Sequence, residues 1–531
     1  MKGRGSQQKG SKTTKGPCTL PEAFIRELFQ FGKDDAFWDD SSVDEGNLPS
    51  TVLRVHEVLR CIDAELQGAA GGEEVTVFPN IVAAKTTTAD ERLQNLSAWL
   101  ADSCQADVTS YKFAASLENS SRGNGVVAQR DIAKDEIFME IPRKALFSAK
   151  FGLAMVPALT PLLAQLEDNP VLELAVLVAY HKVNETASFF APYLAVLPDE
   201  YALPLYWDAD LYGILHGTPT AERAAKSLRA AITLYCRSLT MLHRIPVPSL
   251  PPQRFTWNVF RWALAVVLTR QNNVPCPVAE VPGSFKEVQA LIPGWDMMNH
   301  EPGEMTTGFD VGLDVLTYPA MRAFPVGSEV SMCYGMRQNE LFVNYSGFCV
   351  PDSPFDWFEL PMQLQQDGIL KIREGLVRAA TSAPGPDQGA VALEGAGLVM
   401  VPVRRDQAGL LHPLAWYCAV ASAVDKAEAA AVMRSRFTSY DDLLAAGLLS
   451  EATVERVHET LRGALRDYLR PLEVSLAAMA GAALQPSGQG IEGRKMLPGV
   501  RAATIDACKN LMCGHIDMIQ KALEKLRAPP S

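Results

Sequence analysis

The sequence predicts an α+β protein in which a fold of short β-strands is split by a helical insertion and followed by an all-helical C-terminal domain. Short apolar runs separated by polar turns lie at 125–141 and again within 285–350, which is typical of strands. Apolar residues at helical spacing occupy about 155–285 between these two sets, as in 172–180. Beyond about residue 360 the chain is rich in alanine and leucine and keeps the helical spacing.

The same patterns divide the chain into four regions. We expect a disordered basic tail at 1–20, an N-terminal helical segment at 21–110, the split strand-containing domain at 111–350 and the helical domain at 351–531. Two stretches, at 382–397 and 485–498, are expected linkers within the last region. A parallel dinucleotide-binding sheet would alternate strand and helix regularly, and this pattern does not, so that fold class is excluded.

Composition and charge argue against several classes of protein. The 531 residues carry a net charge of −12, whereas nucleic-acid binding usually needs a basic face. No apolar run reaches the roughly 18 residues that a membrane-spanning helix requires. The 10 cysteines form no CxxC and the 8 histidines no HExxH, so we expect no metal site and reduced thiols. We therefore expect a cytoplasmic protein without a nucleic-acid or membrane partner; the basic tail leaves the nucleus open.

A first polar stretch interrupts the early strands at Ser121–Val126. It contains Gly123 and Gly125 on either side of Asn124. Glycines at this spacing allow a backbone to approach a ligand closely. An ordinary hairpin turn would use the same residues, so this stretch taken alone favours a turn.

A second polar stretch follows an apolar run at Ala290–His300. It places Asp296, Asn299 and His300 at the end of an expected strand. All three side chains can make specific hydrogen bonds. A satisfied structural turn would account for the stretch equally well when it is considered by itself.

A third polar stretch runs from Glu329 to Phe348. An expected strand ends in Tyr334-Gly335, which places a phenol where loops and ligands usually meet. A buried strand tyrosine is the alternative. Considered together, however, the three stretches occur in a characteristic order, with the tyrosine about 35 residues beyond the Asn299-His300 pair.

This ordered set resembles the motifs of SET-domain methyltransferases: a Gly-x-Gly, then an Asn-His pair, then a tyrosine at the end of a strand. The long helical insertion, the helical C-terminal domain and the absence of the cysteine motif of a post-SET segment resemble the Rubisco-methyltransferase branch of that family. The resemblance implies a SET-domain β-fold and a helical substrate-binding domain. It also implies S-adenosyl-L-methionine as the cofactor and a protein as the substrate.

Several stretches are similar in more detail to the actin-histidine methyltransferases of that branch. They are Ala191–Tyr193, Leu197–Tyr201, Pro204–Tyr206, Thr269–Asn272, Trp295–Met297, Thr306–Gly308 and Ser346–Phe348. The similarity covers about Thr87 to Trp357. It departs at Ser121–Asn124, where the family has a more acidic stretch that bears an aromatic residue. The departure leaves the backbone role of this turn in place but not its side-chain contacts.

The resemblance implies a role for each of several residues. Tyr334 and Asn272 are the expected catalytic residues, with Tyr334 beside the reacting atoms and Asn272 orienting the target side chain. Trp295, Gln271 and Arg337 are expected to contact the substrate, which would be actin. The residues expected to bind the cofactor are Arg92, Arg122, Gly123, Asn124, Arg270, Asp296, Met297, Met298, Asn299, His300, Ser346, Gly347 and Phe348.

Two other functions remain open on the sequence. A protein-lysine methyltransferase of the same branch would share every cofactor residue and differ in the target pocket. A SET-like scaffold that binds a partner without catalysis is the alternative from a different class, although such a protein need not keep Asn299, His300 and Tyr334 together. The sequence leaves the oligomeric state open.

Overall fold

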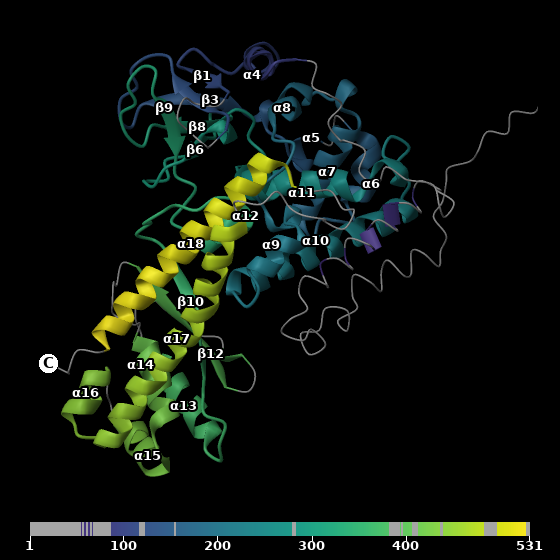
Figure 1. Cartoon of the computed structure of the whole chain (residues 1–531). Coiled ribbons are helices and arrows are strands. Elements are labelled where there is room, and N and C mark those ends of the chain that lie inside the picture. Colours follow the sequence, from purple (N-terminus) through teal and green to yellow (C-terminus); the bar gives the residue numbers. More distant parts are fainter. Residues whose placement is uncertain are drawn as a thin grey trace, which may run out of the picture.

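The computed structural model describes residues 87–115, 123–152, 156–278, 283–381, 393–394, 397–405, 413–435, 439–482 and 496–526, with seven positions between Val52 and Leu66. The tail at 1–20, Arg122 and most of the two expected linkers lie outside the described residues. In Figure 1 a lobe that contains most of the strands is joined by long helices to a second, C-terminal lobe.

The described secondary structure alternates between short strands and blocks of helices. The strands are β1 Tyr111–Ala114, β2 Gly125–Ala128, β3 Ile137–Pro142, β4 Asn272–Pro277, β5 Phe285–Ala290, β6 Asn299–His300, β7 Gly308–Asp310, β8 Val315–Pro319, β9 Glu329–Met332, β10 Trp357–Gln363, β11 Leu393–Glu394 and β12 Leu398–Arg404. The α-helices are α4 Ala89–Ala98, α5 Ala149–Gly152, α6 Thr160–Leu163, α7 Pro170–Val183, α8 Ala191–Val196, α9 Ala209–Ile214, α10 Pro219–Arg244, α11 Trp257–Arg270, α12 Asn339–Tyr345, α13 Leu370–Thr381, α14 Pro413–Ala423, α15 Lys426–Arg434, α16 Tyr440–Ala445, α17 Glu451–Ala482 and α18 Pro498–Lys525.

Three small sheets build the first lobe. One has the strand order β1-β2-β9-β6, the second β3-β8-β7, and β4 and β5 form a two-stranded hairpin. β6 pairs in parallel with β9, with Asn299 opposite Ser331 and His300 opposite Met332. The first sheet therefore brings together strands that are more than 170 residues apart in the sequence, and with them the three polar stretches.

The helical block between the strands is held by apolar packing and by capped ends. α7 and α11 pack closely against each other, and most of their side chains are buried. The Thr256 hydroxyl accepts a hydrogen bond from the backbone N–H of Val259, which satisfies one free donor at the start of α11. α11 ends at Arg270, where Gln271 adopts an extended conformation and the chain enters β4. This junction carries three of the predicted site residues.

A carboxyl group from the N-terminal part of the chain also caps α11. Oδ1 of Asp63, which is fully buried, accepts hydrogen bonds from the backbone N–H of Trp257 at 3.3 Å and from the Tyr235 hydroxyl at 3.2 Å. Burial raises the pKa of Asp63 to about 7 from an ordinary value of 3.8, although these two hydrogen bonds and the charge of Arg261 oppose the shift. The carboxyl therefore holds its proton in the folded state at pH values where the unfolded chain has lost it.

We expect the stability of the protein to depend on pH through this group. A folded pKa above the unfolded one favours the fold at low pH, and this contribution is lost as the pH rises from about 4 to about 7. Asp63→Asn keeps an acceptor oxygen but removes the titration. The free energy of unfolding of the variant, relative to wild type, should rise by about 3 kcal/mol between pH 5 and pH 8, because two pKa units correspond to about that energy. Denaturant unfolding at both pH values measures this difference, and a constant difference would contradict the prediction.

The C-terminal lobe is not all-helical as the sequence predicted, because it contains the sheet β10-β12-β11. β10 and β12 pair antiparallel over their whole length, from Trp357 opposite Arg404 to Gln363 opposite Leu398. β12 alternates buried and half-buried residues, but its sequence, Leu398-Val-Met-Val-Pro-Val, is apolar throughout. A short apolar run of this kind has no visible period of two, so it cannot be distinguished from a helix by pattern alone.

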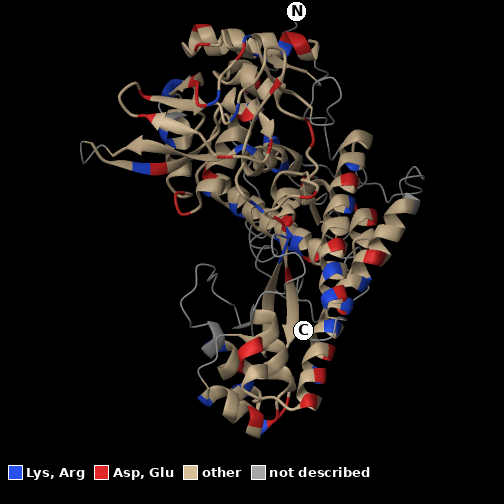
Figure 2. Ribbon diagram, turned by 90° about the vertical axis from the view of Figure 1, so that its left-hand side faces the viewer, with Lys and Arg blue, Asp and Glu red and all other residues tan. Residues whose placement is uncertain are grey.

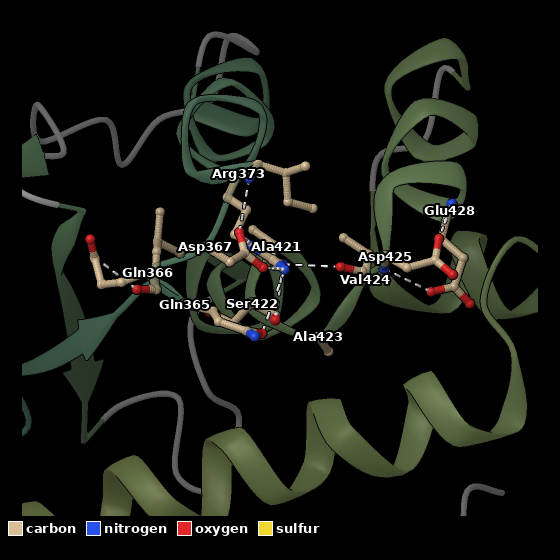
Figure 3. A network of polar contacts seen from close by, with 12 residues as sticks. Gln365, Gln366, Asp367, Arg373, Ala421, Ser422, Ala423, Val424, Asp425 and Glu428 are labelled. Carbon is tan, nitrogen blue, oxygen red and sulfur yellow. Dashed lines mark hydrogen bonds and ion pairs between the residues drawn. The ribbon is translucent and has the colours of Figure 1, made fainter.

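One arginine organises the helices of this lobe. Arg373 of α13 is buried, and its Nη1 donates to the carbonyl oxygens of Ser422 at 2.9 Å and Val424 at 3.0 Å (Figure 3). Its Nη2 is 2.6 Å from the Asp367 carboxylate. The last carbonyls of a helix have no partner within the helix, so the guanidinium satisfies those at the end of α14 and ties α13 to it.

The two long helices α17 and α18 pack along each other and connect the lobes (Figure 1). α18 also contacts α12 of the first lobe, and α17 contacts α9. Acidic and basic residues are interspersed along the long helices (Figure 2). Within the part of the chain that the structure describes, no helix is both long and apolar enough to cross a membrane.

Candidate active site

The expected catalytic tyrosine lies at the end of β9, directly against β6. The backbone N–H of Tyr334 donates to Nδ1 of His300 at 3.0 Å, and the Tyr334 hydroxyl donates to the carbonyl oxygen of Met298 at 2.8 Å. Because Nδ1 accepts this hydrogen bond, the neutral His300 ring carries its proton on Nε2. The backbone and the hydroxyl of Tyr334 are therefore both held by hydrogen bonds to the stretch that carries the Asn-His pair.

Four rings pack around this point. The His300 ring centroid lies 5.2 Å from that of Tyr334, 4.9 Å from Phe342 and 5.8 Å from Phe348. Phe342 and Phe348 stack on each other with centroids 5.0 Å apart. Because His300, Tyr334 and Phe348 are only half-buried, the cluster leaves aromatic ring area against which another aromatic ring can pack.

The Asn299 amide connects this cluster to the glycine turn. Its Nδ2 donates to the carbonyl oxygen of Asn124 at 3.3 Å and to Oε1 of Glu329 at 2.8 Å. The Asn124 side chain in turn donates to the carbonyl oxygen of Val196 in α8. Gly123 has a φ of +77°, a backbone conformation that side chains rarely adopt, and a Cβ there would meet open space. The turn is thus connected by hydrogen bonds to β6 and to α8.

A buried ion pair lies at the junction of α11 and β4. Nη1 of Arg270 donates to the carbonyl oxygen of Asp296 at 2.7 Å and lies 3.5 Å from Oδ2 of the same residue. The Tyr193 hydroxyl of α8 donates to that Oδ2 as well. Nε of Arg270 and Oδ1 of Asp296 are buried without a hydrogen-bond partner among the described residues.

The charges of this pair are fixed by its surroundings. Burial alone would lower the pKa of Arg270, but the charge of Asp296, followed by the phenols of Tyr201 and Tyr193, raises it, so that the guanidinium stays charged. Burial raises the pKa of Asp296, an effect that Arg270 and the Tyr193 hydrogen bond oppose. Burial also raises the pKa of Tyr201 to about 12. Tyr193 and Tyr201 therefore remain neutral hydrogen-bonding groups around one positive and one acidic side chain.

A tight turn connects α12 to Phe348 of the aromatic cluster. The backbone N–H groups of Ser346 and Gly347 both donate to the carbonyl oxygen of Phe342 at 2.8 Å, which ends α12. Gly347 has a φ of +79°, and a Cβ there would lie 3.1–3.2 Å from atoms of Ala202. Only glycine fits both the backbone conformation and this close approach.

The residues expected to contact the substrate lie around the same elements. Trp295 is buried, next to the Asp296 ion pair, and Gln271 follows the last residue of α11. Asn272 begins β4 opposite Ala290 and is half-buried. Arg337 is exposed. Its side chain lies beside Gly335, the residue that follows Tyr334: a Cβ added to Gly335 would be 3.5 Å from Nε of Arg337. Met297 and Met298 are buried beneath the site.

Arg92 has different surroundings from the other predicted residues. Its Nη1 donates to the carbonyl oxygen of Thr87 at 2.6 Å. Its side chain lines a cavity of about 520 Å³ between α4 and α8, together with Trp99, Asp102 and Pro192. Among the described residues, no hydrogen bond or ion pair joins Arg92 to the rest of the predicted site.

Three residues of the site were not assigned a role from the sequence. Tyr193 and Tyr201 lie in stretches that resemble the family, but the sequence around each does not distinguish it from a tyrosine that only packs in the core. Glu329 stands at the start of the third polar stretch, where a charged residue usually marks only a strand end. A buried hydrogen bond between helix α8 and the turn after β5 has no signal in the sequence, because it depends on tertiary packing.

The described residues contain no cluster of histidine, cysteine, aspartate or glutamate suited to a metal ion. The candidate site contains half-buried aromatic rings, the guanidinium of Arg270 and the glycine turn with its backbone amides and carbonyls. These groups fit S-adenosylmethionine, which has an adenine ring at one end and an amino acid at the other.

Comparison with known proteins gives relatives in sequence and in structure. No family model matches the chain. The chain is 31% identical over 269 residues to the actin-histidine N-methyltransferases of Dasypus novemcinctus and Homo sapiens, which covers 49% of this chain and 44% of theirs. It is 30% identical over 302 residues to that of Danio rerio, covering 56% of this chain and 48% of the relative. The chain thus spans about half the length of the curated relatives it matches.

Solved structures share the fold over most of the chain. Rubisco LSMT bound to sinefungin and monomethyllysine superposes with a TM-score of 0.57 at 15% identity, covering 82% of this chain and 91% of that one. The SET domain of LSMT bound to lysine and AdoHcy gives a TM-score of 0.56 at 16% identity, with the same coverage. These comparisons confirm the resemblance predicted from the sequence, and they identify the fold of this chain as the SET-domain fold of Rubisco LSMT.

Proposed function

We propose that this protein is an S-adenosylmethionine-dependent methyltransferase that methylates a histidine side chain of actin. The observation that carries the proposal is the set of hydrogen bonds that joins three distant stretches, at Asn124, Asn299-His300 and Tyr334, in one half-buried cluster. The 31% identity to proteins named actin-histidine N-methyltransferase over 269 residues supports the choice of substrate.

Different residues of the candidate site would bind different parts of the cofactor. His300 and Phe348 offer a surface for the adenine ring, and the guanidinium of Arg270 offers a partner for the carboxylate. When bound, S-adenosylmethionine supplies an activated methyl group on a sulfonium. Displacement at that carbon needs an aligned nucleophile and a site without water, so the task of the protein is to position and to desolvate.

Tyr334 would act beside the reacting atoms. Its hydroxyl donates to the Met298 carbonyl oxygen at 2.8 Å, which holds the phenol in one orientation beside His300. A fixed dipole where charge redistributes lowers the barrier without any reorganisation. The half-buried ring also shields this point from bulk water.

Histidine is favoured over lysine as the target because of its protonation. Methylation requires a free lone pair, and the ordinary pKa is about 6.5 for histidine and about 10.4 for lysine. At pH 7 most histidine is already neutral, whereas deprotonating a lysine costs roughly 4.6 kcal/mol at 1.36 kcal/mol per pKa unit. A histidine enzyme instead has to fix the tautomer and the ring orientation. A side-chain amide that accepts from the second ring N–H would do so.

Asn272 is the residue we propose for this task. It lies two residues beyond Arg270, at the first position of β4, and is half-buried. Wild-type enzyme should methylate an actin peptide with the target histidine far better than the same peptide with lysine, and Asn272→Ala should lose most of this preference. Mass spectrometry of both peptides after incubation at pH 7 measures it. Asn273→Ala, at the exposed neighbouring position, is the matched control.

The competing functions give different results in the same assays. If wild type prefers the lysine peptide at pH 7, the protein-lysine alternative holds. If S-adenosylmethionine does not raise the melting temperature, the protein is a scaffold and not an enzyme, because a ligand that binds only the folded state stabilises it. Methylation of the histidine peptide by wild type, with a clear preference over the lysine peptide, excludes both.

A further inference from the structure

Glu329 lies in the candidate active site beside Asn299, and the resemblance assigns it no role. It is the first residue of β9 and pairs with Val127 of β2, next to the glycine turn. Its Oε1 accepts from Nδ2 of Asn299 at 2.8 Å, and the same nitrogen donates to the carbonyl oxygen of Asn124 at 3.3 Å. An amide nitrogen has two hydrogens, so these two contacts use both.

These contacts leave an excess of acceptors at one spot. With both amide hydrogens directed to Glu329 and Asn124, Oδ1 of Asn299 can only accept. The carboxylate of Glu329 adds a full negative charge. Arg322 interacts electrostatically with Glu329, and this interaction contributes to its raised pKa. The Arg322 guanidinium, however, donates its hydrogen bonds to both carboxylate oxygens of Glu301, at 2.9 and 2.8 Å. Among the described residues, no ion pair neutralises Glu329.

We propose that Glu329 is a cofactor-binding residue, which orients the Asn299 amide and supplies the negative charge that recognises the ammonium group of the cofactor. This inference rests on the proposed function. An ammonium has three donor hydrogens and no acceptor, which matches a carboxylate, an amide oxygen and a backbone carbonyl. Arg270 carries the opposite charge in the same site, so the two residues together suit a zwitterionic amino-acid end.

Cofactor fragments separate this charge effect from a structural effect. S-adenosylmethionine carries both an ammonium and a sulfonium, S-adenosylhomocysteine carries the ammonium alone, and 5′-methylthioadenosine carries neither. Glu329→Gln keeps the size of the side chain and an oxygen that can accept from Asn299, but removes the charge. Glu304→Gln, on an exposed loop, removes one negative charge elsewhere and is the matched control.

Calorimetry with the three ligands tests the proposal. Glu329→Gln should bind S-adenosylmethionine and S-adenosylhomocysteine about tenfold more weakly, as expected for the loss of one charge-assisted hydrogen bond, and 5′-methylthioadenosine as wild type does. Glu329→Asp, which keeps the charge, should retain most of the preference for S-adenosylhomocysteine over 5′-methylthioadenosine, and it also serves if the Gln variant does not fold.

Several results would overturn the inference. They are an unchanged affinity of Glu329→Gln for S-adenosylhomocysteine, an equal loss for all three ligands, and a loss confined to S-adenosylmethionine, which would point to the sulfonium. A similar loss in Glu304→Gln would reduce the effect to overall charge. If wild type binds none of the ligands, the proposed function itself fails, whereas wild-type binding with an unaffected Gln variant removes only the role of Glu329.

Discussion

Replacing Tyr334 with phenylalanine should lower kcat on the actin peptide by about 10²-fold or more and leave the affinity for S-adenosylmethionine nearly unchanged. Removing one fixed polar group at a reacting centre has an effect of this size. Phenylalanine keeps the ring that packs beside His300 and Phe348, so the aromatic surface survives the change. Single-turnover rates with saturating cofactor, together with calorimetry, separate the two quantities.

Tyr345→Phe is the matched control for this experiment. Tyr345 lies on the same segment at the end of α12, but its side chain is exposed. It should keep wild-type kcat and cofactor affinity. An unchanged kcat in Tyr334→Phe would remove Tyr334 from the catalytic assignment, and an equal loss of cofactor affinity would show that the hydroxyl only supports the pocket.

Replacing Arg270 with methionine should destabilise the protein by about 3–5 kcal/mol and abolish measurable cofactor binding. The variant leaves Asp296 buried without its charged partner, and an uncompensated buried charge is costly. It also removes the guanidinium that we expect to hold the cofactor carboxylate. Denaturant unfolding gives the first quantity and calorimetry the second.

A double variant separates stability from binding at this pair. In Arg270→Met/Asp296→Asn, the buried charge is gone and the Tyr193 hydroxyl still has an oxygen to which it can donate. The double variant should therefore regain much of the lost stability but none of the cofactor affinity. If the single variant is as stable as wild type, the ion pair does not hold the junction of α11 and β4. Recovery of binding in the double variant would exclude Arg270 as a cofactor residue.

The sequence could indicate only those residues of the candidate site that local patterns mark, and not those that tertiary packing brings to it. The strand that ends at Tyr334 and the pair at Asn299-His300 were visible because polar residues interrupt apolar runs. The resemblance then added Arg270, and the structure places its guanidinium on Asp296, 26 residues later. Tyr193 could not be found in this way, because nothing local distinguishes a tyrosine that reaches a carboxylate from one that only fills a core.

Two expectations about the fold show the same limit. β12 escaped detection because both faces of the strand are apolar, so the period of two disappears from its sequence. Arg92 was expected at the cofactor from its place in the helix before the strands. The structure places its Nη1 on the Thr87 carbonyl oxygen, beside a cavity along α8, and its role at the cofactor stays a prediction. Which face of a helix meets a ligand depends on how the helix is docked, and the pattern of α4 does not determine this.

The cap that Asp63 provides has a consequence for anyone who wishes to work with a shorter chain. α11 is a rod of 14 residues, about 21 Å long, with Asp63 at its first N–H and Arg270 at its last turn. A fragment begun at Thr87 would keep every predicted site residue. It would nevertheless lack the Asp63 carboxyl, which accepts from the Tyr235 hydroxyl and from the backbone N–H of Trp257. An inactive fragment would then report the loss of a distant support and say nothing about the chemistry of the pocket.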